Sequence, residues 1–219
     1  MANAFKVPSD QYRRPQRAFS GKELQHIAIS ITAITLIFAI SFSDLVYNLD
    51  DSDILEQFLY WLAIAATVTI LGFLLHEMAH KFVARRYNAW AEFRMYPMGL
   101  LLGFITALLG FTLIAPGAVY IGGNITKEQY GRISLAGPAT NIVIGSIFLV
   151  AWLLLNDGSL LSDSLNIMAV LSLMLAVFNL LPIPPLDGSK VLRWNVPIYI
   201  IVMAMAVFLF LVSWQVIAI

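Results

Sequence analysis

Five stretches of this chain carry no charged side chain and are long enough to cross a lipid bilayer. They cover residues 24–43, 57–75, 133–156, 164–186 and 194–219. A helix needs ~20 residues to span the hydrocarbon core, and each stretch is close to that length. Because 60% of the residues are hydrophobic and 12% are charged, the chain cannot cover all its elements with a water-facing surface. The sequence therefore predicts an all-α polytopic membrane protein with five to six transmembrane helices.

Charged residues outside these stretches separate by sign. Lys and Arg gather before the first, third and fifth spans and after the second, whereas the loops 44–56 and 156–163 contain acids and no Lys or Arg. Under the positive-inside rule, every basic cluster lies in the cytosol and both acidic loops lie outside. The cluster after the second span, which consists of Lys81, Arg85 and Arg86, is thereby assigned to the cytosolic side.

A sixth apolar segment, residues 95–126, is expected to enter and leave the membrane on the same side. A single crossing would move every later loop to the wrong side of the membrane for its charge. The six glycines of the segment, together with Pro97 and Pro116, favour a broken or extended structure over one straight helix. Such backbone survives at membrane depth only where protein or a wet cavity covers it. We predict a re-entrant segment between the second and third spans, and the pattern leaves open whether it is a β-hairpin or a broken helix.

The N-terminal 22 residues are polar and basic. Because no small-residue cleavage site follows the first apolar stretch, we expect a retained anchor and not a cleaved signal peptide. The expected organisation is a basic cytosolic segment, residues 1–22, followed by a single membrane-embedded domain, residues 23–219. Capping-box spacing predicts that helices begin near residues 21, 54 and 127.

The second span ends with the pattern H-E-x-x-H, formed by His76, Glu77 and His80. On a helix, the two histidines project from nearly the same face, with the glutamate beside them. Charged side chains at membrane depth cost roughly 2.5 kcal/mol or more each, so they usually persist where they perform chemistry or conduction. The pattern indicates a zinc site with a neighbouring base. Since the chain has no cysteine, any metal must be held by histidine and carboxylate.

A catalytic zinc site usually has three protein ligands and a fourth position for water. His26, at the start of the first span, is better explained as an interfacial residue. Asp187 is the stronger candidate, because it is the only acid near the cytosolic end of the fourth span. Prolines within residues 182–185 can turn the chain back to the depth of His76. Taken alone, this segment also fits a turn with a solvated aspartate.

Two further motifs accompany H-E-x-x-H: N-x-x-P-x-x-P-L-D-G at residues 179–188 and G-P-x-x-N at residues 137–141. Over about residues 57–194 the chain resembles the site-2 protease family of intramembrane zinc metalloproteases. The resemblance implies a membrane-embedded β-hairpin or small sheet between the first motif and the third span. It also implies one zinc ion per chain, bound by His76, His80 and Asp187, with Glu77 as the catalytic acid and base.

The same resemblance implies that Asn141 and Asn179 lie close to the metal. Their polarity within apolar spans suggests that they support the substrate or the transition state through hydrogen bonds. The family's PDZ-like insertion is not expected, because no polar stretch of the chain exceeds about 30 residues.

The predicted function is that of an intramembrane zinc metalloendopeptidase, which cleaves transmembrane segments near the cytosolic side in regulated intramembrane proteolysis. A membrane metal-ion transporter is an alternative, but it requires polar groups on a path to both faces, and these groups cluster near one face. A catalytically inactive scaffold is another, yet all four candidate residues for the chemistry are present.

The expected partners are the lipid bilayer and a single-pass membrane protein as substrate. A net charge of zero gives no reason to expect nucleic acid. The expected location is the cell membrane, with the N-terminus and the opening of the active site in the cytosol. The sequence does not determine the oligomeric state.

Overall fold

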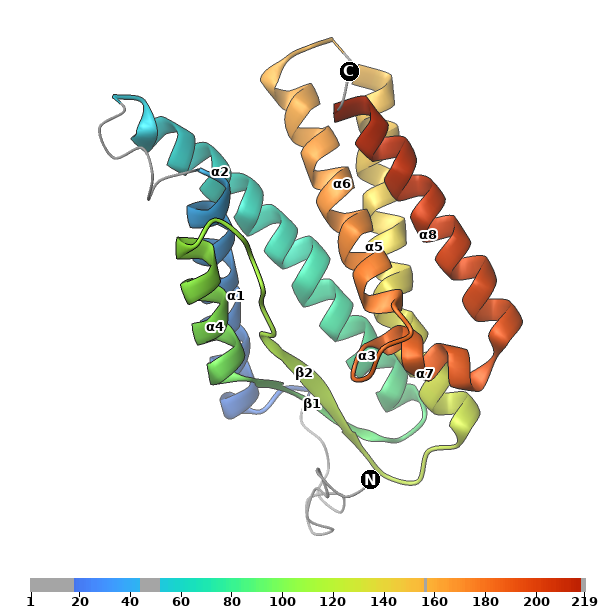
Figure 1. Ribbon diagram of the computed structural model, residues 1–219. Helices are drawn as coiled ribbons and strands as arrows, with labels where there is room; N and C mark the ends of the chain where they lie inside the picture. The colour runs from blue at the N-terminus through green and yellow to red at the C-terminus, as the bar shows by residue number, and fades with distance from the viewer. Residues whose placement is uncertain (1–17, 44–51, 156, 218–219) are drawn as a thin grey trace.

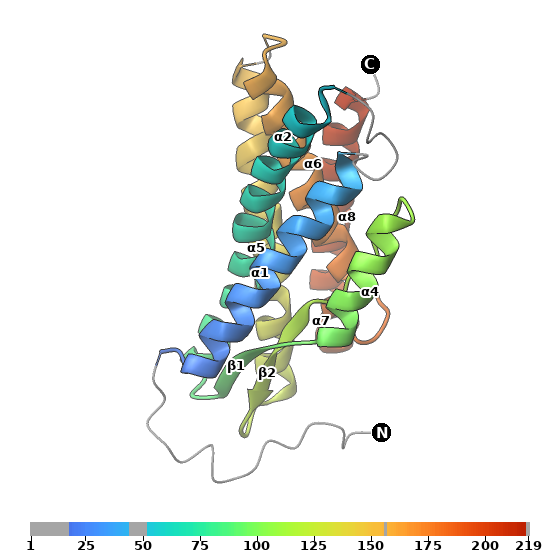
Figure 2. The same ribbon diagram turned by 90° about the vertical axis from the view of Figure 1, so that its left-hand side faces the viewer.

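The computed structural model describes residues 18–43, 52–155 and 157–217. Within these residues, five helices are long and apolar enough to cross a membrane, and they correspond in order to the five predicted spans. They comprise α1 (Gly21–Phe42), the continuous helix Ile54–Arg86, α5 (Lys127–Leu155), α6 (Leu160–Leu180) and α8 (Val196–Ile217). Figures 1 and 2 show α5, α6 and α8 side by side, with α1 inclined to them. The prediction of a polytopic helical membrane protein is confirmed.

Helix starts follow the capping pattern of the sequence. The Ser20 hydroxyl accepts a hydrogen bond from the Glu23 amide at 3.1 Å, and α1 begins at Gly21. At the start of α5, Thr126 and Gln129 form a reciprocal capping box, with hydrogen bonds of 2.9 and 3.2 Å. These bonds satisfy amides that have no partner inside the helix. Helices begin at Gly21, Ile54 and Lys127, as predicted.

The second span is longer than predicted and changes its winding near the middle. It consists of α2 (Ile54–Val68), the π-helical segment η2 (Thr69–Leu74) and α3 (Leu75–Arg86). Such π-helical turns inside α-helices frequently occur at functional sites. Lys81 belongs to this helix and not to the loop that follows it. Lys81 lies inside α3 with 1% of its surface exposed, because an ion pair with Glu23 of α1 compensates its burial.

The re-entrant segment contains both structures that the sequence left open. Strand β1 (Trp90–Met95) leads into helix α4 (Pro97–Leu108), and strand β2 (Gly117–Gly122) returns antiparallel to β1, with Phe93 opposite Val119. Figures 1 and 2 both show α4 beside α1 and the two strands at the end of the molecule near α3 and α7. The segment therefore enters and returns on one side, as expected from the charge pattern.

Helix α5 packs against α3, α6 and α7 (Asp187–Trp194), and small residues allow the close approach. A Cβ atom added at Gly131 would lie 2.3 Å from the Trp194 ring of α7, and one at Gly145 would lie 2.6 Å from Leu173 of α6. Small residues at such contacts are typical of helix packing in membranes. Helix α5 thus holds α3 and α7 near each other.

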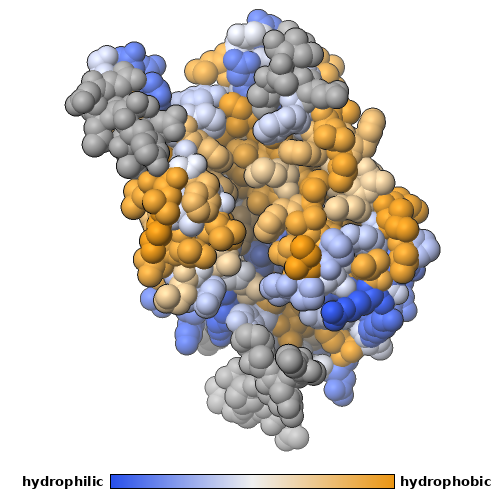
Figure 3. Space-filling view, viewed as in Figure 1, coloured by the Kyte–Doolittle hydropathy of each residue, from blue (hydrophilic) through white to orange (hydrophobic). Residues whose placement is uncertain are grey.

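Large apolar side chains cover much of the outer surface. Figure 3 shows hydrophobic residues over most of the height of the molecule. More than half of the surface of Ile147, Leu154, Ile201 and Phe208 is exposed. An exposed apolar surface of this extent fits lipid and not water as the surrounding medium.

Candidate active site

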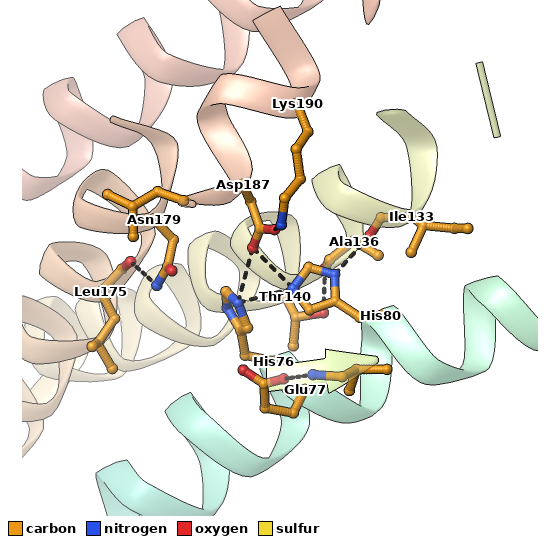
Figure 4. A network of polar contacts seen from close by, with 12 residues as sticks. His76, Glu77, His80, Ile133, Ala136, Thr140, Leu175, Asn179, Asp187 and Lys190 are labelled. Atoms are coloured by element: carbon orange, nitrogen blue, oxygen red, sulfur yellow. Dashed lines mark hydrogen bonds and ion pairs between the residues drawn. The ribbon is translucent and has the colours of Figure 1, made fainter. Parts of the chain in front are cut away.

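The side chains of His76, His80 and Asp187 converge beside the first half of α3, although Asp187 is more than 100 residues away in the chain. His80 Nε2 lies 3.0 Å from His76 Nε2 and 3.0 Å from Asp187 Oδ2, and His76 Nε2 lies 3.4 Å from the same oxygen. Figure 4 shows the two rings and the carboxylate pointing toward one another. Ligands at ~2.0–2.1 Å from a tetrahedral zinc ion lie roughly 3.4 Å apart, so this donor set has the right size and chemistry for zinc.

The ring of His80 is oriented by a backbone carbonyl. Its Nδ1 donates a hydrogen bond to the carbonyl oxygen of Ile133 at 2.7 Å, in the turn of α5 that precedes Pro138. Since a carbonyl only accepts, Nδ1 carries the proton, and the lone pair of Nε2 is directed into the space that Asp187 and His76 also face, where a cation would bind. Fixing a metal-binding tautomer through the other ring nitrogen is the usual arrangement at histidine ligands.

Asp187 reaches the histidines because the chain turns sharply between α6 and α7. Helix α6 ends at Leu180, and Asp187 is the first residue of α7. A Cβ atom added at Gly188 would lie 1.9 Å from the Leu180 carbonyl oxygen, so only glycine permits this approach. The short loop between the helices thereby returns the carboxylate to the level of His76 and His80.

Gly137 leaves the space in which a metal would sit beside the histidines. A Cβ atom added there would lie 2.4 Å from His80 Nε2 and 2.5 Å from His76 Nε2. At Gly137, therefore, α5 presents only its backbone to the ligand atoms. The glycine of the G-P-x-x-N motif thus serves the candidate metal site because it has no side chain.

Lys190 supports the ionised form of Asp187 from the side opposite the histidines. Its Nζ donates to Asp187 Oδ1 at 2.9 Å and leaves Oδ2 directed at the two rings. Burial by itself disfavours the charged form of the Asp187 carboxyl, and the ammonium group of Lys190 acts against this effect. The pairing thus favours the deprotonated carboxylate that metal binding requires, and it leaves Oδ2 free to act as the ligand atom.

Replacing Lys190 with methionine is expected to weaken zinc binding by about 10–100-fold, because the free oxygen of Asp187 loses its hydrogen bond. Competition with a chromogenic chelator measures the affinity. Lys127→Met, at the start of α5, removes the same charge from a residue outside the site and should leave the affinity unchanged. Equal affinities for the two variants would contradict this role of Lys190.

Glu77 lies beside the histidines and contacts the re-entrant sheet. Its Oε2 accepts a hydrogen bond from the Val119 amide of β2 at 3.1 Å, and 9% of its surface is exposed. Figure 4 shows this carboxylate below His76, with the strand that carries Val119 next to it. A carboxylate at this place can accept a proton from a water molecule between it and the metal position.

The two asparagines stand in different environments. Asn141 is one turn after Gly137 on the same face of α5, 1% exposed, and its Oδ1 has no hydrogen-bond partner among the described residues. Asn179 is half-buried near the end of α6, and its Nδ2 donates to the Leu175 carbonyl at 2.9 Å. Asn141 thus has a free acceptor oxygen, whereas the amide group of Asn179 is already bonded to Leu175, and the roles of both residues remain predictions.

His26 contacts the outer edge of β1, whereas Glu77 contacts the outer edge of β2. Its Nδ1 accepts a hydrogen bond from the Met95 amide of β1 at 3.4 Å. Among the described residues, the group of His, Asp and Glu side chains close enough to hold a metal consists of His76, His80 and Asp187. The geometry thus agrees with the choice of Asp187 over His26.

Comparison with known proteins agrees with this geometry. The model of peptidase family M50 matches residues 155–212. A provisionally named zinc metalloprotease of Methanocaldococcus jannaschii is 43% identical over 187 residues, which cover 84% of this chain and 90% of that protein. The chain belongs to peptidase family M50, the site-2 protease family. With its membrane-spanning helices, this family membership makes the chain a membrane zinc metalloprotease.

Other M50 relatives are longer. A second zinc metalloprotease of M. jannaschii is 28% identical over 140 residues, or 64% of this chain and 36% of that protein. The provisionally named zinc metalloprotease Rip3 of Mycobacterium tuberculosis is 32% identical over 140 residues, or 61% of this chain and 32% of that protein. The chain thus spans about a third of the length of these two relatives. No solved structure matches it.

Sequence reasoning missed three parts of this M50 site. Lys190 follows Asp187 by three residues, one helical turn, and this spacing was a usable signal. Gly137 was visible within its motif, but its contact with both rings depends on the packing of α5 on α3. The amide of Val119 carries no signal in the sequence, because every residue except proline has one.

Proposed function

We propose that this M50 chain hydrolyses peptide bonds in the transmembrane segment of a single-pass membrane protein, near the cytosolic face of the cell membrane. The observation that carries the proposal is the burial of His76, Glu77, His80 and Asp187 beside a spanning helix, with 9% or less of each residue exposed. A peptide bond must enter the protein at membrane depth to reach these groups. Such cleavage would serve regulated intramembrane proteolysis.

The residues divide the chemistry among them. His76, His80 and Asp187 would hold one zinc ion, which supplies a Lewis acid that activates water and polarises the scissile carbonyl. Glu77 accepts the proton of the attacking water and passes it to the leaving amine. The Asn141 side chain can donate a hydrogen bond to the developing oxyanion or to the substrate backbone.

The substrate segment would pair with the outer edge of β2. The Val119 amide points at Glu77 and so away from β1, and with a period of two the Ile121 amide also points outward. A locally unwound substrate that adds as a strand to this edge would pass directly beside the base. Figure 3 shows a hollow between the surface over α4 and the surface over α6, with hydrophilic residues at its base.

Basic residues at the ends of two helices suggest how the protein is oriented in the membrane. Helix α3 ends with Arg85 and Arg86, and α7 carries Lys190 and Arg193. By the positive-inside rule this end faces the cytosol. The active site is one to three helical turns below it, so that a short polar path to the cytosol suffices.

Ile121→Pro tests the substrate-binding edge. Proline removes an outward amide and leaves the bonds between β1 and β2 in place, so we expect a loss of about tenfold for a helical transmembrane peptide and a smaller loss for an already flexible peptide. Ile121→Ala is the control, because it shortens the side chain and keeps the amide. Equal losses for both peptides, or for both variants, would argue against strand addition.

The central test uses purified protein in detergent micelles. Metal is counted by mass spectrometry, and a transmembrane peptide is incubated with the protein before chelation, after chelation and after zinc is returned. We expect about one zinc per chain and cleavage that disappears and reappears with the metal. Fragment masses locate the cut. Cuts confined to the polar flanks of the peptide, or an intact peptide with zinc-loaded protein, would contradict the proposal.

A further inference from the structure

A buried ion pair joins the first span to the helix that carries the histidines. Glu23 of α1 has 0% of its surface exposed and Lys81 of α3 has 1%, and Lys81 Nζ lies 2.5 Å from Glu23 Oε2. The ammonium group also lies 3.9 Å from the centre of the Phe19 ring. Lys81 directly follows His80 and is one helical turn after Glu77.

The second oxygen of Glu23 holds the re-entrant sheet. Glu23 Oε1 accepts a hydrogen bond from the Phe93 amide of β1 at 2.9 Å. Phe93 is opposite Val119 in the sheet, and the Val119 amide donates to Glu77. At this pair of residues, therefore, the outward amide of each strand is bonded to a carboxylate. Glu23 fixes β1, and Glu77 fixes β2.

Stability alone does not explain a buried Glu–Lys pair. Removing two charges from water is so unfavourable that a well-packed apolar pair of similar size is often equally stable or more stable. What an apolar pair cannot provide is an acceptor for the Phe93 amide, which would otherwise be buried without a partner at a cost of about 1–3 kcal/mol. The function of the pair thus lies in its contact with the sheet.

We infer that Glu23, held in place by Lys81, is a positioning residue that sets the β1–β2 sheet against α3 and so fixes the substrate edge of β2 relative to Glu77 and the histidines. Lys81 fixes one oxygen of Glu23, which leaves the other oxygen for Phe93. Because Lys81 and Glu77 belong to the same helix, α3 carries both the base and the anchor of the sheet. The consequence for cleavage rests on the proposed function, whereas the placement of the sheet does not.

Two double variants separate positioning from stability. Glu23→Gln with Lys81→Met removes both charges and keeps an oxygen that can accept from the Phe93 amide. Glu23→Leu with Lys81→Met removes both charges and the acceptor. The two proteins differ only at position 23, in side chains of similar size. Neither leaves an unpaired charge in the core, so both are expected to fold.

Mobility of the sheet gives a readout that does not depend on catalysis. The chain has no cysteine, so Ala118→Cys on the exposed face of β2 accepts a single nitroxide label. We expect the electron paramagnetic resonance spectrum to show a more mobile label in the Leu variant than in the Gln variant and the parent. Without the label, the Leu variant should also cleave a transmembrane peptide about tenfold less efficiently, chiefly through KM, with zinc content unchanged.

Three outcomes would overturn the inference. The first is an identical label mobility in the Leu and Gln variants. The second is equal loss of cleavage in both, which would mean that the charges and not the acceptor matter. The third is loss of zinc from the Leu variant, since Glu23 would then act through the metal site. If the parent protein cleaves no transmembrane peptide, the proposed function fails, and the nitroxide spectra alone decide whether Glu23 positions the sheet.

Discussion

Replacing Gly137 with alanine is expected to remove stoichiometric zinc from the purified protein. The new methyl group would lie 2.4 and 2.5 Å from the Nε2 atoms of His80 and His76, well inside van der Waals contact. Both rings would have to move from the position at which they meet Asp187. We expect the zinc affinity to fall by about a hundredfold or more, which exceeds the effect of most changes around a metal site.

The fold should survive this change, because alanine favours a helix over glycine by about 1 kcal/mol. Circular dichroism and gel filtration in detergent check the fold, and mass spectrometry after dialysis against a weak chelator counts the metal. Gly21→Ala is the matched control, since nothing lies within 4 Å of the Cβ atom that it adds. Full zinc occupancy in the Gly137→Ala protein would refute the assignment of the metal to this place.

Glu77→Gln is expected to lower the cleavage rate by about 10²–10⁴-fold while zinc remains bound. Glutamine has nearly the shape of glutamate, and its side-chain oxygen can still accept the hydrogen bond from Val119. It cannot accept a proton from water at neutral pH. The sheet and the metal ligands should thus be undisturbed, and only proton transfer should be lost.

The measurement is the single-turnover rate on a transmembrane peptide, together with a metal count for the same preparation. Glu128→Gln provides the control, because Glu128 is exposed and pairs with Arg132 near the start of α5, away from the ligand atoms. A Glu77→Gln protein that keeps its zinc and cleaves at the parent rate would remove Glu77 from the mechanism.

The spanning helices were predictable because the bilayer imposes a local rule on sequence. A segment without charges and of sufficient length is recognised without knowledge of its neighbours. Ser20 and Thr126 act within three residues of the amides that they cap, so the starts of α1 and α5 were also visible. The same holds for His76, Glu77 and His80, whose common face follows from helical geometry alone.

The burial of Lys81 could not be predicted, because it depends on a residue far away in the chain. A lysine near the end of an apolar run is ordinarily solvated, and the positive-inside rule treats it so. Its partner Glu23 is 58 residues away in the chain. Only the packing of α1 on α3 brings the two together, and that packing follows from the shapes of both surfaces and not from either segment.

The sequence by itself determined the membrane-spanning class, the pair of histidines with its glutamate, and the return of the chain between the second and third spans. All of these follow from composition, helical period or charge along one stretch of chain. The tertiary structure decided how Asp187 meets His76, that Gly137 faces both rings, and which amides of the sheet reach Glu77 and Glu23. These contacts join segments far apart in the chain, so their geometry exists only once the helices have packed.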